Sequence, residues 1–269
     1  MVREEKHDRG LEFVTAVVER VSQPFQSVRR VTARLSEIID HAAWGRANVA
    51  FRIFLGDDYG GASRIYTVRA FDAEQRTICF DIVLHGESSP MMQWSSQLDR
   101  GTRFDIAGPR PHFLIPDAGD RKVALFLDAT AIPALFALLT QAEAPISGTG
   151  WVHTDDERYF AELPDCPGLV LHRIGGAGTR DVPLLEQALA LNGPMIGSVW
   201  GAGERKEMRT VRAHFRDTLG LPASSVAVAG YWTSGISNSQ VDKVRQKVYE
   251  SLLAEGGTPE EFDYLSLEL

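Results

Sequence analysis

The sequence predicts two domains: an antiparallel β-barrel followed by an α/β domain with an open parallel sheet. The first half of the chain carries six β-like runs separated by turn residues, which is typical of a closed barrel. The second half alternates β-like and helix-like runs, which is typical of a parallel sheet with helices on both faces. We expect a flexible N-terminus at 1–10, the barrel at 11–117 and the α/β domain at 118–269.

Each barrel strand is predicted from an alternation of apolar and polar residues that is rich in β-branched side chains. Two helical segments interrupt the strands. The first runs from Ser36, its expected N-cap, to Trp44, and the second runs from Pro90 to about Leu98 with Ser89 as N-cap. The predicted strands span residues 11–21, 27–35, 48–55, 64–71, 77–85 and 103–107.

The α/β domain follows a loop at 111–121. Its first strand, 122–128, is a continuous apolar run, as expected for a strand buried on both faces. Ligands of parallel sheets bind at the carboxyl ends of the strands, where Asp128, Thr130, Gly201–Glu204 and Gly230–Trp232 are expected. Further strands are predicted at 150–153, 169–174, 197–200 and 226–231, and helices at 131–141, 155–163, 182–191, 205–219 and 238–254.

The composition indicates a cytoplasmic protein. A hydrophobic content of 44% with 24% charged residues is typical of soluble globular chains. No apolar run approaches the ~20 residues that span a bilayer, and the charged first ten residues do not form a signal peptide. The formal net charge of −8 argues against nucleic acid as a partner. Cys79 and Cys166 cannot ligate an iron–sulfur cluster or form a disulfide framework, and we expect no metal site.

The segment Arg64–Arg69, R-I-Y-T-V-R, is the main functional signal in the barrel. Strand alternation places Arg64 and Tyr66 on one face and Thr67 on the other. An arginine fork suits a phosphate, a tyrosine ring suits a flat heteroaromatic ring, and a threonine hydroxyl can hydrogen-bond a ring nitrogen. A flavin nucleotide would use all three groups. An exposed cationic strand with one packed tyrosine explains the motif equally well.

A second anion site is predicted where the strand ending near His85 leads through Gly86, Ser88 and Ser89 into the helix that starts at Pro90. Free backbone N–H groups and the helix dipole favour an anion at such a helix start. An ordinary capped helix is the alternative. Taken together with Arg64, this helix start favours a dinucleotide.

The order and spacing of these motifs resemble the siderophore-interacting proteins, a branch of the ferredoxin–NADP reductase superfamily. This resemblance implies an FAD-dependent reductase that passes electrons from NADH or NADPH through the flavin to a ferric siderophore and releases Fe(II). A flavin suits that task because it accepts hydride and gives up single electrons. The matching segments are R-I-Y-T-V-R at 64–69, D-I-V-L-H-G at 81–86, P-M-M-Q-W at 90–94, G-P-R at 108–110, D-A-T-A-I-P-A at 128–134, W-G-A-G-E at 200–204 and G-Y-W at 230–232.

The resemblance also implies roles for single residues. Arg64 would contact the FAD pyrophosphate, Tyr66 would stack on the isoalloxazine, and Thr67 would hydrogen-bond near flavin N5 as the one catalytic candidate. The nicotinamide nucleotide would be held by Thr130, Gly201, Gly203, Glu204 and Trp232. The remaining residues predicted to bind cofactor are Val68, Arg69, Asp81, Val83, His85, Gly86, Ser88, Ser89, Met91 and Met92.

Several positions depart from the family pattern. Thr233-Ser234 follows G-Y-W where an arginine is usual, which leaves the electron donor and the acceptor open. The other departures are Ser89-Pro90, Pro111-His112, and Leu127 and Ala129 on either side of Asp128. One alternative is a flavoenzyme of the same fold with another acceptor or a biosynthetic role. Another is a non-catalytic protein that binds a siderophore or a nucleotide. We expect a monomer, and NADH, NADPH and ferredoxin all remain open as donors.

Overall fold

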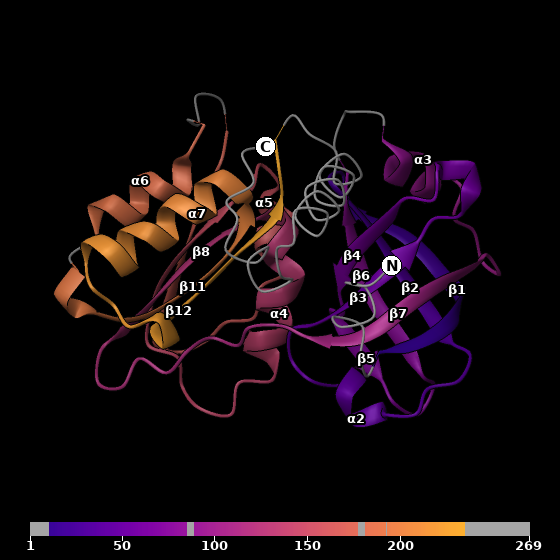
Figure 1. Ribbon diagram of the computed structural model, residues 1–269, viewed down its shortest axis with the longest axis horizontal. Helices are drawn as coiled ribbons and strands as arrows, with labels where there is room; N and C mark the ends of the chain where they lie inside the picture. Colours follow the sequence, from indigo (N-terminus) through magenta and orange to yellow (C-terminus); the bar gives the residue numbers. More distant parts are fainter. Residues whose placement is uncertain (1–10, 85–88, 177–180, 192, 235–269) are drawn as a thin grey trace, which may run out of the picture.

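The computed structural model describes residues 11–84, 89–176, 181–191 and 193–234 of the chain. A seven-stranded antiparallel sheet and a five-stranded parallel sheet stand side by side (Figure 1). This arrangement confirms the predicted fold class. The predicted helix at 238–254 and the N-terminus at 1–10 lie outside the described residues.

The antiparallel sheet curls around an aromatic core. Phe80 contacts both Phe51 and Phe104 edge to face, and Trp44 packs against Phe51. The helices α2 (His41–Trp44) and α3 (Pro90–Ser96) lie at opposite ends of the barrel. The strand order is β4-β3-β7-β1-β2-β6-β5, with β1 (Glu12–Phe25), β2 (Val28–Leu35), β3 (Val49–Phe54), β4 (Ser63–Thr67), β5 (Ala70–Asp72), β6 (Thr77–Val83) and β7 (Arg103–Pro111).

The predicted strand 64–71 changes its hydrogen-bonding partner in the middle. The Val68 amide donates to the Val49 carbonyl at 2.7 Å, whereas the Arg69 amide donates to the Cys79 carbonyl at 2.8 Å. Consequently β4 pairs with β3, and β5 pairs with β6 at the other end of the sheet. One continuous segment therefore joins the two ends of the strand order and closes the barrel.

The predicted helix that starts at Ser36 is too long, since α2 begins only at His41 and its N-cap is Asp40. The Glu12 carboxylate accepts from the amides of Ile39 and Asp40 at 2.8 and 2.9 Å, which ties this stretch to β1. By contrast, the predicted start of α3 is confirmed. The Ser89 hydroxyl accepts from the Met92 amide at 3.2 Å.

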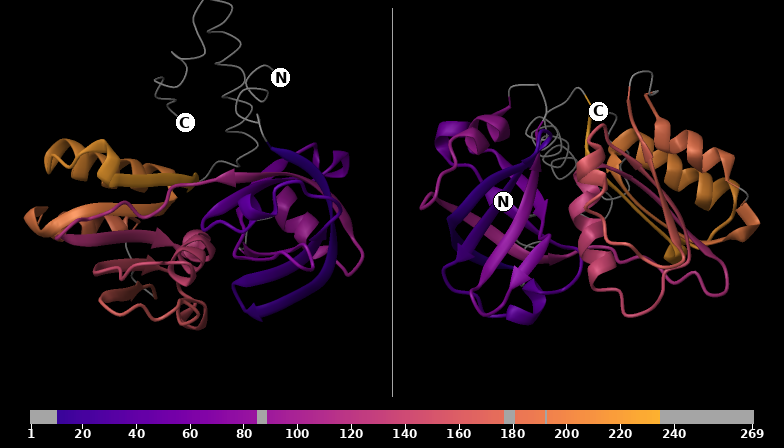
Figure 2. Two further views of the ribbon diagram at one scale, coloured as in Figure 1. Left: turned by 90° about the horizontal axis from the view of Figure 1, so that it is seen from below. Right: turned by 180° about the vertical axis from the view of Figure 1, so that it is seen from behind.

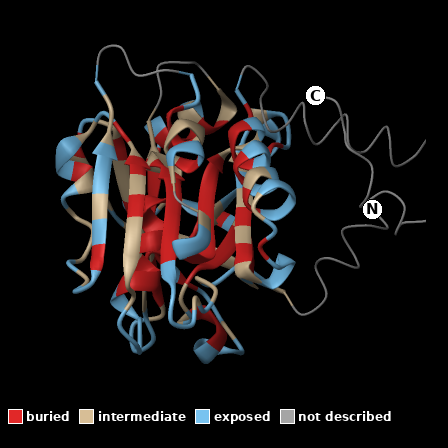
Figure 3. Ribbon diagram, turned by 90° about the vertical axis from the view of Figure 1, so that its left-hand side faces the viewer, coloured by how far each residue is buried: buried red, intermediate tan, exposed pale blue. Residues whose placement is uncertain are grey.

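The parallel sheet is covered on both faces, as predicted. Val123, Leu125 and Leu127 pack towards α4 on one face, while Ala124 and Phe126 pack towards α6 and α7 on the other. Figure 3 shows buried residues running through the middle of this sheet. The order is β10-β9-β8-β11-β12, with β8 (Lys122–Asp128), β9 (Gly148–His153), β10 (Leu169–Ile174), β11 (Ile196–Glu204), β12 (Val226–Trp232), α4 (Ile132–Thr140), α5 (Glu157–Phe160), α6 (Pro183–Ala190) and α7 (Arg205–Ala213).

Several predicted ends are wrong, and β1 is one example, since it runs to Phe25 instead of Val21. Strand β11 continues to Glu204 instead of ending at Trp200, because it pairs with β8 on one side and β12 on the other. Strand β7 continues from Ala107 to Pro111 because β3 pairs with it there. The helical segment after α7 widens into a π-type turn at His214–Thr218. The described residues also contain short 3₁₀ turns: η1 (Asp57–Tyr59), η2 (Ala129–Ala131), η3 (Gly193–Met195) and η5 (Ala223–Ser225).

An apolar cluster crosses the junction between the two sheets. Phe25 and Val28 of the barrel belong to the same buried cluster as the α4 residues Leu135 and Leu138. Both views of Figure 2 place α4 beside the barrel. The segment 112–121 connects the sheets, and the boundary between residues 117 and 118 stays a prediction. None of the helices in the described ranges is long and apolar enough to cross a membrane.

We expect Gly148→Ala to destabilise the parallel sheet. A Cβ atom at Gly148 would lie 2.0 Å from the Val123 carbonyl oxygen, so β8 and β9 would have to move apart. The expected loss is about 1–3 kcal/mol of the free energy of unfolding, measured by urea denaturation. Gly45→Ala is the control, because a Cβ there meets Phe71 at an ordinary 3.6 Å. Equal stability of the two variants would contradict this packing.

Candidate functional site

The segment Arg64–Arg69, which we call the motif strand, presents its side chains in the predicted alternation. Tyr66 and Val68 pack against the barrel core, and the Tyr66 ring lies 5.7 Å from that of Phe80 between centroids. Arg64 is partly exposed and donates to the Ser63 carbonyl at 2.7 Å. Burial raises the pKa of Tyr66, and the positive charge of Arg64 opposes this rise. Arg64 and Tyr66 are therefore close neighbours, as the strand pattern predicts.

Thr67 points away from the barrel core and towards the α/β domain. It is 9% exposed, and its side chain lies close enough to the Tyr231 hydroxyl of β12 to lower the pKa of Tyr231 against the rise that burial causes. The His112 ring meets Tyr231 edge-on, with 5.8 Å between the ring centroids. Burial lowers the pKa of His112, and the charge of Arg110 lowers it further. The motif strand and the end of β12 thus meet at the junction of the two domains.

The carboxyl ends of β8, β11 and β12 meet around the Asp128 carboxylate. Its Oδ1 atom accepts from the Thr130 amide at 2.9 Å and the Thr130 hydroxyl at 2.5 Å. Its Oδ2 atom accepts from the indole Nε1 of Trp232 at 2.6 Å. A Cβ at Gly203 would lie 2.7 Å from Oδ2, so only glycine leaves room for this carboxylate. The structure therefore brings Thr130, Gly203 and Trp232 together, as expected for parallel strand ends.

Burial raises the pKa of Asp128, and its hydrogen bonds with Thr130 and Trp232 oppose this shift. Glu204 occupies the same edge of the sheet. Its carboxylate accepts from the Glu207 amide at 2.9 Å as the N-cap of α7, and from the Ser234 amide at 3.2 Å. Glu204 therefore holds the chain beyond Trp232. Its contact with a nicotinamide nucleotide stays a prediction.

Gly201 lies inside β11 and not in a turn. A Cβ there would meet the Phe126 carbonyl at 2.6 Å, so packing between β8 and β11 explains this glycine. Thr233 is 5% exposed, and its hydroxyl has no hydrogen-bond partner among the described residues. This residue stands where the family pattern has an arginine.

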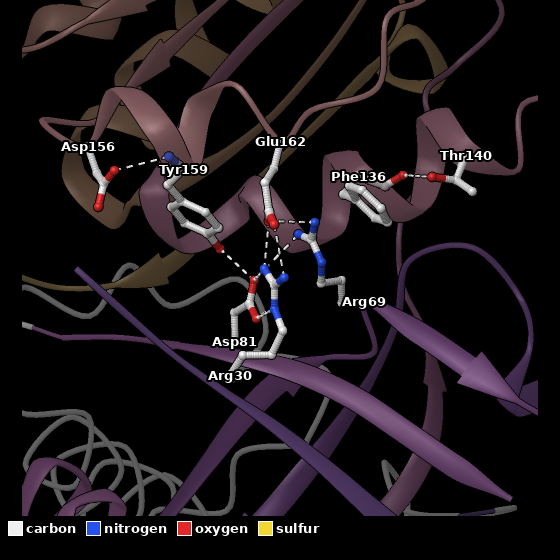
Figure 4. A network of polar contacts seen from close by, with 8 residues as sticks. All are labelled: Arg30, Arg69, Asp81, Phe136, Thr140, Asp156, Tyr159 and Glu162. Carbon is white, nitrogen blue, oxygen red and sulfur yellow. Dashed lines mark hydrogen bonds and ion pairs between the residues drawn. The ribbon is translucent and has the colours of Figure 1, made fainter. Parts of the chain in front are cut away.

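Arg69 and Asp81 belong to a cluster of ion pairs (Figure 4). Arg30 binds Asp81 through a two-pronged contact of 2.7 and 2.9 Å, and it binds Glu162 at 3.0 and 2.6 Å. Arg69 donates to Glu162 at 2.8 Å and to Asp81 at 3.4 Å. We call these four residues the charge cluster. Burial by itself would raise the pKa of Glu162, but the two arginines hold it below its usual value.

Two aromatic residues of the α/β domain complete the surroundings of the charge cluster. The Tyr159 hydroxyl donates to Asp81 at 3.1 Å, and the guanidinium carbon of Arg69 lies 3.6 Å from the centre of the Phe136 ring. The side chains of Arg69 and Asp81 are 5% and 0% exposed. Both residues therefore join the two domains. Their predicted contact with a cofactor stays untested.

The other predicted site residues have mixed positions. Met91 is buried in the barrel core and Met92 packs against it, whereas Val83 packs against the apolar cluster at the domain junction. His85, Gly86 and Ser88 lie outside the described residues. Sequence reasoning placed Asp128 and Tyr231 at ligand-binding strand ends without giving either a role, and it did not select Arg30, Tyr159 or Glu162 as site residues. A charged residue that ends the apolar run 122–128 was the available signal for Asp128.

We expect Asp128→Asn to destabilise the edge of the parallel sheet. Both carboxylate oxygens accept from donors, so the amide nitrogen of asparagine would face either Thr130 or Trp232. The expected loss is about 1–3 kcal/mol in urea denaturation. The exposed Asp165 provides the matched control, Asp165→Asn, which should leave stability unchanged. An Asp128→Asn protein as stable as this control would contradict the assignment of acceptors.

The chain matches two families of known sequence. Residues 120–235 match the family described as "Siderophore-interacting protein", and residues 48–113 match the "Siderophore-interacting FAD-binding domain". A protein of Acinetobacter baumannii named "Ferric acinetobactin reductase" is 30% identical, covering 99% of this chain and 94% of the relative. "Ferric vibriobactin reductase ViuB" of Vibrio cholerae is 24% identical, covering 70% of each chain.

Solved structures agree with these matches. The siderophore-interacting protein from Acinetobacter baumannii superposes with a TM-score of 0.84 at 30% identity, covering 91% of this chain and 99% of the other. SipS from Aeromonas hydrophila has a TM-score of 0.71 at 22% identity, covering 89% and 98% of the two chains. The second likeness supports the fold alone. The matched families and the relative of nearly full length show that this chain belongs to the siderophore-interacting protein family.

Proposed function

We propose that this protein is an FAD-dependent reductase that passes electrons from NADH or NADPH to a ferric siderophore. The observation that carries the proposal is the meeting of two predicted sites at the domain junction. Thr67 of the motif strand lies beside Tyr231. The next residue along β12, Trp232, is bound to Asp128 at the edge of the parallel sheet. The names of the relatives from Acinetobacter baumannii and Vibrio cholerae support this assignment.

The residues on the motif strand fit FAD. The cofactor needs a cationic group for its pyrophosphate, a flat surface for its ring and a hydrogen-bonding group near the ring nitrogens. Arg64 provides the first and is partly exposed. Tyr66 provides the second, and Phe80 supports its ring from the barrel core. Thr67 provides the third, and it lies beside Tyr231 at the domain junction.

Each residue then has a stated task. Arg64 would bind the pyrophosphate, Tyr66 would support the ring, and Thr67 would present its hydroxyl near the atom that takes up hydride. Bound FAD would take up two electrons as hydride from the nicotinamide and pass them on one at a time to ferric iron. Thr130, Gly203 and Trp232 surround Asp128 at the sheet edge, where a nicotinamide nucleotide would bind.

The test is an anaerobic titration followed by absorbance. Purified protein loaded with FAD should show flavin bands that NADH or NADPH bleaches and that a ferric siderophore restores. Failure of FAD to bind would contradict the assignment of the motif strand. Bands that resist both nicotinamides, in protein that dithionite does reduce, would contradict the proposed donor.

A second candidate is a flavoenzyme of the same fold with a different electron acceptor. Thr233 favours it, since a buried hydroxyl that has no partner within the described part of the chain replaces the arginine of the family pattern. This candidate predicts flavin that a nicotinamide bleaches but that no ferric chelate restores. Restoration by a ferric siderophore would exclude it.

We expect Arg64→Ala to weaken FAD binding. The substitution removes a charge-assisted contact worth about 1.5–3 kcal/mol, which is roughly ten- to a hundredfold in Kd. Fluorescence titration of the apoprotein with FAD measures this loss. Arg103→Ala is the control, because it removes an exposed arginine of the same domain. Unchanged Kd in the Arg64 variant would contradict the phosphate role.

We expect Thr67→Ala to slow flavin reduction about tenfold while FAD binding survives, because the hydroxyl that orients the reacting atoms is lost. Thr67→Ser keeps the hydroxyl and serves as the matched variant. Stopped-flow absorbance at saturating nicotinamide measures the step. A wild-type rate in the alanine variant would remove Thr67 from the reaction.

A further inference from the structure

We propose that the charge cluster is a clamp between the two domains, and that Glu162 is a positioning residue for electron transfer from the nicotinamide to the flavin. The clamp follows from contacts within this chain. The effect on electron transfer rests on the proposed function.

The two domains contribute unequal charges to the cluster. The barrel supplies Arg30 from β2, Arg69 from between β4 and β5, and Asp81 from β6, for a formal sum of +2 − 1 = +1. The α/β domain supplies Glu162, which brings the sum to zero. A buried charge without a partner of opposite sign is costly, so the excess positive charge on this face of the barrel is neutralised only when Glu162 contacts it.

The contacts of Glu162 restrict the relative orientation of the two domains as well as the distance between them. Its Oε2 atom accepts from Arg30 at 2.6 Å and from Arg69 at 2.8 Å, and its Oε1 atom accepts from Arg30 at 3.0 Å. The guanidinium of Arg69 also lies on the Phe136 ring of α4. Planar arginine forks bind carboxylates in a narrow range of angles. The cluster therefore restricts rotation of one domain against the other.

The clamp is joined to the candidate site through a single stretch of backbone. Arg69 lies two residues after Thr67, in the segment that closes the barrel. In that segment Thr67 lies beside Tyr231, and Arg69 contacts both Glu162 and Phe136 of the α/β domain. These contacts of Thr67 and Arg69 restrict where the parallel sheet lies relative to the motif strand. Reaction rates respond to misplacements of about 1 Å, so loss of one of these contacts should slow transfer between the domains.

Other contacts keep the domains together when Glu162 is altered. The Ser27 hydroxyl donates to Asp156 at 2.6 Å, and Phe25 belongs to the apolar cluster at the junction. A change at Glu162 should therefore loosen the angle between the domains without separating them.

The decisive variant is Glu162→Gln, which removes the charge and keeps the size of the side chain. Anaerobic stopped-flow should show flavin reduction by the nicotinamide slowed about tenfold. The Kd of FAD and the oxidation of dithionite-reduced protein by a ferric siderophore should stay within twofold of wild type. The control Glu157→Gln removes an exposed carboxylate from α5 and should leave all three values unchanged.

A second measurement needs neither cofactor nor substrate. In the apoprotein, the unfolding free energies of Glu162→Gln, Arg69→Gln and the double variant form a cycle. We expect strong non-additivity in this cycle. The exposed Arg34–Glu19 pair, 2.8 Å apart within the barrel, should give a cycle close to additive. Small-angle X-ray scattering should show a broader distribution of shapes for Glu162→Gln than for wild type.

Three results would overturn the proposal. Wild-type flavin reduction in Glu162→Gln would remove its positioning role, as would an equal loss in FAD affinity and in both half-reactions. Additive unfolding energies together with unchanged scattering would remove the clamp. If neither NADH nor NADPH reduces the flavin of the wild-type protein, only the proposed electron donor is contradicted. The unfolding cycle and the scattering measurement then still test the clamp.

Discussion

The change of strand partner between Val68 and Arg69 is the constraint on which the rest of this structure depends. Because the chain leaves β3 and joins β6 at that point, one segment closes the barrel and reaches the second domain. Strand alternation then directs Tyr66 to the barrel core and Thr67 to Tyr231. A shift of one residue would reverse every side chain along this segment.

Two buried carboxylates organise the surroundings of this segment. Asp81 is bound by Arg30, Arg69 and Tyr159, and Asp128 is bound by Thr130 and Trp232. Burying a carboxylate is unfavourable unless its oxygens are hydrogen-bonded, so such groups tolerate few arrangements of their neighbours. We therefore regard them mainly as devices that fix orientation, one between the domains and one at the end of the parallel sheet.

Local pattern predicted much of the fold. Alternation and turn residues identified the barrel strands, and Ser89 with Pro90 identified the start of α3. The errors arose where distant residues decide. The Glu12 carboxylate binds the amides of Ile39 and Asp40, so that α2 begins only after them. Pairing with β8 and β12 extends β11 to Glu204. The charge cluster escaped prediction because Arg30 and Glu162 are 132 residues apart in the sequence. Thr130, Gly203 and Trp232 were expected at the carboxyl ends of parallel strands, the family resemblance gave them a role, and the structure gathers them around Asp128.

The most direct measurement of the central claim is a crystal structure of the protein with oxidised FAD. We expect the isoalloxazine against Tyr66, its N5 edge towards Thr67, and the pyrophosphate in contact with Arg64. We also expect that the contacts of Glu162 with Arg30 and Arg69 persist. FAD bound away from residues 64–67, or a complex in which Glu162 has left the arginines, would contradict the account.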